Sequence, residues 1–213
     1  MKIVLFGASG LVGSLLVPLL HSHDLTVVGR RATGLANERV APVADWPTAV
    51  AALQPEIVIS TLGTTIAKAG SRAAFTAIDH DAVAAVATAA KAAGARQFMM
   101  VSSVGADANA SNFYVSTKGR VEASVGALGF ERLDIFRPGL LIGERDGDPR
   151  LVERLFTMLS PLTNALTPRR FDRYRAIAAA HVAAAMARAV GAAPASIYIH
   201  HNRDMLEPAR KLA

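Results

Sequence analysis

Three side chains in the middle of the chain have the types and spacing of a proton-transfer site. Ser103 follows an apolar run, Tyr114 lies eleven residues later, and Lys118 follows four residues after Tyr114. Residues four apart on a helix project from the same face. The ordinary pKa of a tyrosine is about 10, and a nearby ammonium favours its ionised form. Since a serine hydroxyl can hold a carbonyl oxygen beside the tyrosine, the pattern predicts proton transfer to or from that oxygen.

The spacing of Tyr114 and Lys118 is common by chance, and its alternative interpretation is a partly exposed helix with a lysine on its surface. Position favours catalysis here, because a serine at the end of a strand precedes the pair, and a glycine motif precedes the serine. Ser102 stands next to Ser103. The sequence leaves open which of the two hydroxyls orients the carbonyl.

A glycine turn near the N-terminus predicts a dinucleotide site. The apolar run from Lys2 to Phe6 leads into Gly7-Ala8-Ser9-Gly10-Leu11-Val12-Gly13, and an apolar helix is expected from Ser14 to Leu20. Gly7 permits the turn, Gly10 leaves room for a pyrophosphate, and Gly13 lets the helix pack on the strand. The backbone at Ser9, Leu11 and Val12 is expected to complete the phosphate site at the start of the helix. The alternative is an ordinary glycine turn.

Two arginines at the end of the second strand predict the choice of cofactor. The strand runs from Leu25 to Gly29 and is followed by Arg30 and Arg31. NAD-binding folds place an acid near this point to hold the ribose 2′-hydroxyl, whereas an arginine accommodates a 2′-phosphate. NADP(H) is therefore favoured over NAD, and the alternative is a solvated arginine pair.

The fourth strand is expected to bring a second loop to the cofactor. The sequence predicts a short third strand from Val40 to Val43, a fourth from Glu56 to Thr61, and then Leu62, Gly63, Thr64 and Thr65. Ligands of doubly wound sheets lie outside the carboxyl ends of the strands, so these four residues should contact the cofactor. The segment from Leu62 to Phe75 is predicted to be a long loop that closes over the reacting end.

The remaining elements alternate between strand and helix. Strands are predicted at 97–101, 133–136 and 196–200, and helices at 79–93, 151–159 and 176–190. This order predicts an α/β fold with a doubly wound, largely parallel sheet, the NAD(P)-binding Rossmann fold. Residues 1–213 should form one domain, to which 140–175 contribute a small substrate cap. Arg169, Arg170, Arg173 and Arg175 in or beside that cap fit either an anion site or a solvated surface.

Composition excludes several classes of function. The chain has no cysteine, so a thiolate metal site is excluded, and so is the thiol nucleophile of a semialdehyde dehydrogenase. The net charge of +6 is dispersed and no nucleic-acid motif accompanies it, so an anionic cofactor is the expected partner and nucleic acid is not. His200 and His201 would point to opposite faces of a strand, and no metal site is predicted. No signal peptide or membrane-length apolar run is present, so a soluble, cytoplasmic protein is expected.

Taken together, these residues resemble the short-chain dehydrogenase/reductase superfamily, specifically an atypical NADP-binding branch similar to the Tat-interacting-protein oxidoreductase-like proteins. The resemblance is carried by Gly7 to Gly13, Leu62 to Thr65, Lys68-Ala69-Gly70, Ser102-Ser103, Tyr114, Lys118-Gly119, Glu122 and Arg137-Pro138-Gly139. It covers nearly the whole chain.

The resemblance implies a role for each residue of the reacting end. Ser103, or else Ser102, would orient the carbonyl, and Tyr114 would be the acid-base group. Lys118 would hold the nicotinamide ribose and tune Tyr114, and Pro138 would border the nicotinamide. The asparagine that many superfamily members use for proton relay has no counterpart between Asp79 and Ala93.

The expected function is an NADPH-dependent oxidoreductase that acts on a small carbonyl or alcohol. One alternative is a non-catalytic NADP(H) sensor that signals through a protein partner, because fold alone does not establish activity. Another is an enzyme like the nucleotide-sugar epimerases and dehydratases, although a small cap leaves little room for a nucleotide.

Overall fold

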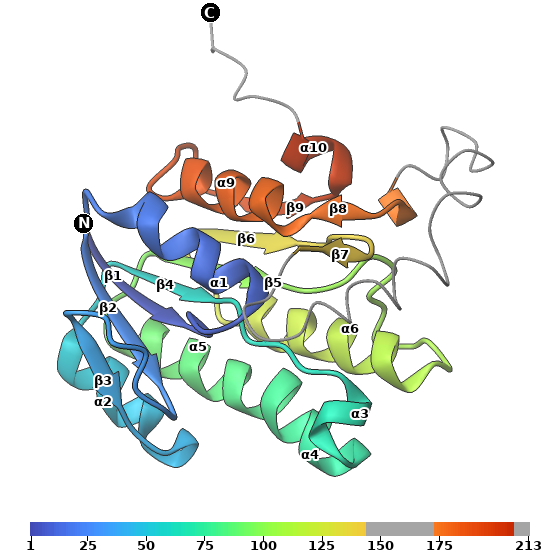
Figure 1. The fold of residues 1–213 in the computed structure, drawn as a ribbon, viewed down its shortest axis with the longest axis horizontal. Helices are drawn as coiled ribbons and strands as arrows, with labels where there is room; N and C mark the ends of the chain where they lie inside the picture. The colour runs from blue at the N-terminus through green and yellow to red at the C-terminus, as the bar shows by residue number, and fades with distance from the viewer. Residues whose placement is uncertain (144–172, 207–213) are drawn as a thin grey trace, which may run out of the picture.

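A sheet of seven parallel strands forms the centre of the molecule (Figure 1). The computed structural model describes residues 1–143 and 173–206. The strands lie in the order β3-β2-β1-β4-β5-β6-β9. Their bounds are Lys2–Phe6 (β1), Asp24–Gly29 (β2), Glu38–Val40 (β3), Ile57–Ser60 (β4), Gln97–Val101 (β5), Arg132–Phe136 (β6) and Ile197–His200 (β9). The predicted doubly wound parallel sheet is confirmed.

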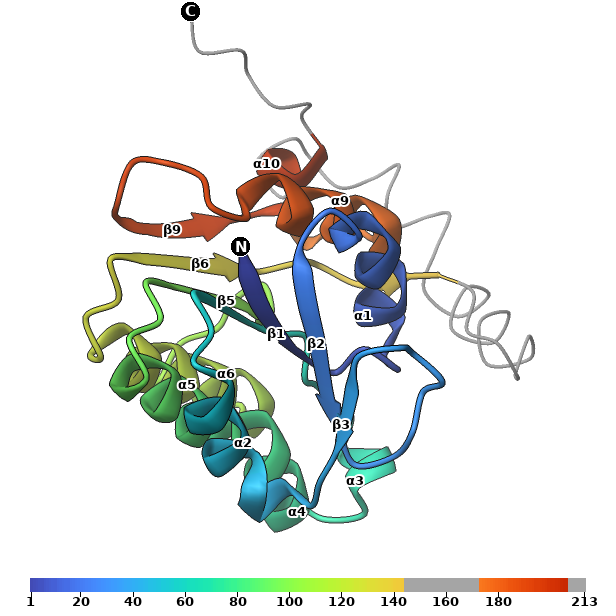
Figure 2. The same ribbon diagram turned by 90° about the vertical axis from the view of Figure 1, so that its left-hand side faces the viewer.

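Helices cover both faces of the sheet (Figure 2). One face carries α1 (Leu11–Leu16), α9 (Ala179–Ala189) and α10 (Asn202–Leu206), and the other carries α2 (Trp46–Leu53), α5 (Val83–Ala92) and α6 (Phe113–Gly126). Successive side chains of a strand point to opposite faces, so β1 supplies both cores. Ile3 and Leu5 belong to the core beneath α1 and α9, whereas Val4 and Phe6 belong to the core beneath α2 and α5. A strand buried on both faces explains the continuous apolar run in the sequence.

Two early elements differ from the prediction. The third strand is Glu38–Val40 and not Val40 to Val43; the chain from Val43 to Asp45 is instead a short 3₁₀ turn after Pro42. The first helix begins at Leu11 rather than Ser14, and it tightens into a 3₁₀ turn over Val17–Leu20, where Pro18 lies. Proline has no N–H to donate and is tolerated in the first turn of a helix, so one 3₁₀ turn contains its proline in the first turn and the other directly follows one, whereas the earlier helix start follows Gly10.

The predicted long loop from Leu62 to Phe75 is wrong in its second half. Helix α3 (Ile66–Ala69) begins after Thr65, whose hydroxyl accepts from the Lys68 amide. Helix α4 (Arg72–Thr76) begins after Ser71, whose hydroxyl accepts from the Ala74 amide. Hydroxyl side chains at these positions satisfy amides that the first turn leaves unpaired.

Helix α4 continues without a break into α5. The connection is a π-helical turn over Ala77–Ala82, so one helix extends from Arg72 to Ala92. The helix predicted from Asp79 to Ala93 is therefore the second half of a longer one. A π turn corresponds to one extra residue within an α-helix, and such turns are frequent at functional sites.

The C-terminal half adds a second, small sheet in which β7 (Leu141–Ile142) pairs with β8 (Ile177–Ala178). The helix predicted from Leu151 to Leu159, Arg169 and Arg170, and most of the predicted cap lie outside the described residues.

A buried carboxylate ties the edge strand β9 to the sheet. Asp134 on β6 is fully buried; Arg132 donates to both of its oxygens, at 2.7 and 2.8 Å. Gln97 donates to the same carboxylate at 2.7 Å, and His200 Nε2 on β9 lies 2.8 Å from it. Burial alone would raise the pKa of Asp134, but the hydrogen bonds from His200, Arg132 and Gln97 outweigh burial and lower that pKa.

The lowered pKa of Asp134 makes the stability of the fold sensitive to acid. Because the folded pKa is depressed, the stabilisation is present above the unfolded value of about 3.9 and is lost as pH falls through the folded value. Asp134→Asn should lower the free energy of unfolding at pH 7 by about 2 kcal/mol and flatten its dependence on acid pH. Urea unfolding at several pH values measures both, with Glu131→Gln on an exposed neighbour as control. An acid profile as steep as that of the wild type would contradict the assignment.

Candidate functional site

The loops that follow β1, β4, β5 and β6 emerge side by side at one edge of the sheet. The four strands are neighbours, and Phe6, Ser60 and Met100 are in register across three of them. Val101 on β5 is paired with Phe136 on β6. Parallel strands end at the same edge, so the glycine turn, the Leu62 loop, the two serines and Pro138 are neighbours there.

The glycine turn after β1 is packed against the start of the next loop. Gly7 has a φ of +88°, and a Cβ there would lie 2.7 Å from Thr61 Oγ1. A Cβ on Gly13 would overlap the carbonyl oxygen of Gly7. Both positions therefore require glycine for the fold itself, as the sequence predicted.

Gly10 is different, because neither its backbone nor its packing demands a glycine so strongly. Its φ of −81° and ψ of 168° are open to any residue. A Cβ there would lie 3.1 Å from the Gly7 carbonyl oxygen, a contact that a small shift relieves. The bare backbone at Gly10 thus keeps space free above the turn. Helix α1 begins at the next residue with no acid in its first turn, so the cradle fits a pyrophosphate.

The two arginines predicted to select the cofactor lie directly after β2. Arg30 and Arg31 are both exposed. An acid that sequence reasoning missed lies just beyond this loop: Glu38, the first residue of β3, accepts hydrogen bonds from the backbone N–H and the hydroxyl of Thr33 at 2.6 and 2.7 Å. These hydrogen bonds lower the pKa of Glu38. The carboxylate is thus held by Thr33, whereas the two guanidinium groups face solvent.

Tyr114 lies in the first turn of α6. The helix begins after Asn112, whose side-chain oxygen accepts from the Val115 amide. The Tyr114 ring is half-buried and packs against Phe75 of α4, with ring centroids 5.5 Å apart. Within residues 1–143 and 173–206, no hydrogen bond is formed by its hydroxyl. The position of the ring is thus fixed by its packing against Phe75.

Lys118 is buried and its ammonium is paired with an acid that the sequence analysis did not single out as a site residue. Its Nζ lies 2.6 Å from Asp79 Oδ1, and the exposed fractions of the two side chains are 5% and 0%. Asp79 comes from the π-helical turn. The other oxygen of Asp79 accepts from the Thr64 amide at 3.0 Å. The acid therefore connects Lys118 with the loop that follows β4.

The two candidate serines have different surroundings. Ser102 is buried and its hydroxyl donates to Glu122, which is held in turn by Arg137. Ser103 is half-buried, and among the described residues its hydroxyl makes one long contact, 3.4 Å to the carbonyl oxygen of Val104. Since Ser102 is already committed to Glu122, the geometry favours Ser103 as the group that could hold a carbonyl oxygen.

Pro138 closes the edge on the side of β6. It is buried, and its carbonyl oxygen accepts from the Val104 amide at 2.9 Å. The next residue, Gly139, donates to Asn202, and a Cβ on it would overlap the carbonyl oxygen of Arg175. The chain beyond β6 is thus packed tightly against the C-terminal segment.

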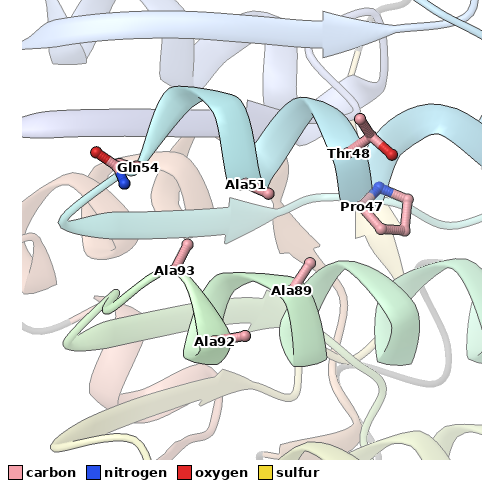
Figure 3. Close-up of a pocket in the computed structure, with 7 residues that line it drawn as sticks. All are labelled: Pro47, Thr48, Ala51, Gln54, Ala89, Ala92 and Ala93. Atoms are coloured by element: carbon pink, nitrogen blue, oxygen red, sulfur yellow. The ribbon is translucent and has the colours of Figure 1, made fainter.

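A hollow lies between two helices on one face of the sheet. A groove of about 470 Å³ separates α2 from α5 and is lined by Pro47, Thr48, Ala51, Gln54, Ala89, Ala92 and Ala93 (Figure 3). None of these side chains titrates, so the groove offers no acid-base chemistry. Among the described residues, no group of three metal-ligating side chains is gathered, and none of the helices there is long and apolar enough to cross a membrane.

Comparisons with known proteins agree with this arrangement. The model of the NAD-dependent epimerase/dehydratase family matches residues 3–120. The mitochondrial protein FMP52-1 of Scheffersomyces stipitis is 34% identical over 166 residues, which cover 73% of this chain and 74% of that protein.

Solved structures show the same fold at lower identity. WbmH of Bordetella bronchiseptica in complex with NAD⁺ has a TM-score of 0.69 at 18% identity, covering 95% of this chain and 76% of that one. The dTDP-4-dehydrorhamnose reductase of Bacillus anthracis in complex with NADP has a TM-score of 0.66 at 16% identity, covering 95% and 76%. At these identities the likeness shows the fold alone, and the bound dinucleotides, NAD⁺ in one structure and NADP in the other, are properties of those proteins.

The cytoplasmic location expected from the sequence is contradicted by the relatives. The FMP52 proteins that match this chain are mitochondrial by name. The expectation rested on the lack of a recognisable signal peptide and of a membrane-length apolar run, and neither feature identifies the compartment of a protein.

Proposed function

The chain belongs to the NAD-dependent epimerase/dehydratase family, and on this premise we propose that it is an NADPH-dependent oxidoreductase for a small carbonyl or alcohol. The bound dinucleotide supplies or accepts the hydride at the substrate carbon. In reduction, Tyr114 gives its proton to the carbonyl oxygen, which becomes the alcohol, and in oxidation the proton returns. Ser103 holds that oxygen in place.

The observation that carries the proposal is the shared edge of the sheet. Gly10 follows β1 and Ser103 follows β5, with β4 between these two strands, and Tyr114 lies in the first turn of the helix that comes after β5. A dinucleotide whose pyrophosphate lies over the glycine turn would extend along this edge from β1 toward β5. Its reacting end would then meet Ser103 and Tyr114, whereas its 2′-phosphate would meet the loop after β2.

The test is consumption of NADPH in the presence of a panel of small aldehydes and ketones. A reductase consumes NADPH in proportion to the alcohol formed, and Tyr114→Phe should lower this rate by roughly 10² or more. Binding of NADPH without turnover of any substrate would favour the alternative, a sensor that acts through a protein partner.

An epimerase or dehydratase is a second candidate, and the description of the matching family model favours it. Such an enzyme returns the hydride to the substrate, so it would isomerise or dehydrate a nucleotide sugar with no net consumption of dinucleotide. Product analysis with and without net NADPH oxidation separates the two reactions.

Cofactor choice gives the first test at the binding step. Because Arg30 and Arg31 are exposed and Glu38 is engaged by Thr33, NADPH should bind at least about tenfold more tightly than NADH, or about 1.4 kcal/mol. Arg30→Asp should remove that preference, since a carboxylate repels the 2′-phosphate. Fluorescence titration with both dinucleotides measures it, with exposed Arg96→Asp on the far edge as control. An unchanged ratio of dissociation constants in Arg30→Asp would refute the argument.

A further inference from the structure

The ion pair between Asp79 and Lys118 is unusual because both groups are buried at the edge where chemistry is expected. Removing one partner of a buried pair leaves the other charge uncompensated, so replacing either side chain alone should be destabilising. Asp79 Oδ1 lies 2.6 Å from Lys118 Nζ, so the two groups form a close ion pair.

The pair lies directly beneath the loop that follows β4. A Cβ added at Gly63 would lie 3.8 Å from Asp79 Oδ1 and 4.0 Å from Lys118 Nζ. The Thr64 amide donates to Asp79 Oδ2 at 3.0 Å. The Asp79 carboxylate therefore contacts both the Lys118 ammonium on α6 and the backbone of the Gly63–Thr64 loop, and it fixes their relative position.

We propose that Asp79 is a positioning residue for the reacting end of the dinucleotide, acting through Lys118 and the Thr64 amide. This rests on the proposed function, in which Lys118 contacts the nicotinamide ribose. An ammonium has three donors and no acceptor, so an acid on one side can fix its place while its protons face two ribose hydroxyls on the other. Asp79 also neutralises the buried charge before any ligand arrives, so the lysine is in place for binding.

The other charged side chains around Lys118 have partners of their own, so Asp79 is the acid that pairs with the ammonium. Glu122, one turn further along α6, is engaged by Arg137 and Ser102. His80 and Asp81, the neighbours of Asp79, pair with each other at 2.8 Å. Arg72 of α4 lies over the ring of Phe113, 5.1 Å from its centroid. In the described part of the chain, the acid within ion-pair distance of Lys118 is Asp79.

A double-mutant cycle on NADPH affinity tests the proposal. Asp79→Asn keeps an acceptor for the Thr64 amide and removes the charge, and it should weaken NADPH binding about tenfold. Lys118→Met should weaken it by about tenfold or more. The double variant should bind about as weakly as Lys118→Met alone, because the carboxylate acts on the ribose through the ammonium. Asp81→Asn, an exposed acid of the same turn, is the matched control and should bind as the wild type does.

Several results would overturn the proposal. If the effects of Asp79→Asn and Lys118→Met multiply, or if Asp79→Asn binds normally, Asp79 is not coupled to the lysine. If Asp79→Asn alone does not fold, the double variant should fold, since it buries no charge, and weaker binding there than in Lys118→Met would count against the coupling. Failure of the wild-type protein to bind any nicotinamide dinucleotide would instead refute the proposed function.

Discussion

Replacing Tyr114 with phenylalanine is expected to lower kcat by roughly 10² to 10⁴ and to leave the dissociation constant of NADPH almost unchanged. The substitution removes only the hydroxyl that gives or takes the proton. The packing should survive, because a phenylalanine ring can keep the contact with Phe75 whose centroids are 5.5 Å apart. Steady-state kinetics on a substrate found in the carbonyl panel, together with an NADPH titration, gives both quantities.

Tyr198→Phe provides the matched control. Its hydroxyl donates to the Pro194 carbonyl oxygen at 3.1 Å, in the segment before β9. That variant should turn over like the wild type. A Tyr114→Phe protein that retained the wild-type kcat would show that another group transfers the proton.

Replacing Gly10 with valine is expected to weaken NADPH binding by roughly 10³ or more, a loss of about 4.1 kcal/mol. The backbone at Gly10 suits any residue, and a Cβ meets only one close atom, the Gly7 oxygen at 3.1 Å. The valine side chain would therefore occupy the space above the turn without preventing the turn from forming. Circular dichroism and thermal unfolding should remain close to the wild type while binding is lost.

Valine substitutions at two other glycines serve as controls for Gly10→Val. Gly126→Val in α6 should bind NADPH normally, because nothing lies within 4 Å of a Cβ there. Gly13→Val should fail to fold, since its Cβ would overlap the Gly7 oxygen. NADPH affinity in Gly10→Val equal to that of the wild type would mean that the phosphates lie elsewhere.

The strands could be predicted because burial on both faces leaves a plain signature. The runs that became β1, β5 and β6 are short, apolar and bounded by turn residues, and their order implies the parallel sheet. Helix α3 was missed because it is too short to show a periodic pattern, and α4 was missed because only its five residues precede the π turn of the longer helix. Their one signal was local: Thr65 and Ser71 each stand at the position of a helix N-cap.

The candidate site could be predicted as a set of positions but not as a set of contacts. The spacing of Tyr114 and Lys118 placed them on one helix, yet the ion pair with Asp79 joins residues 39 positions apart. The different surroundings of Ser102 and Ser103 depend likewise on Glu122, twenty residues after Ser102. Such long-range contacts have no periodicity, so only the folded chain reveals them.

Asp79 lies in the π-helical turn over Ala77–Ala82, so its ion pair with Lys118 depends on the number of residues in this helix as well as on the residue types. A π turn corresponds to one extra residue within an α-helix. Deleting Ala77, two residues before Asp79, would let the helix relax to the α form and rotate the residues on one side of the deletion by about 100° about its axis. The N-cap of α4 at Ser71 and the ion pair of Asp79 with Lys118 could then no longer both form. Homologous chains that lack the extra residue must therefore present the equivalent side chain from a different position, and an alignment without a gap in this helix would compare the wrong residues.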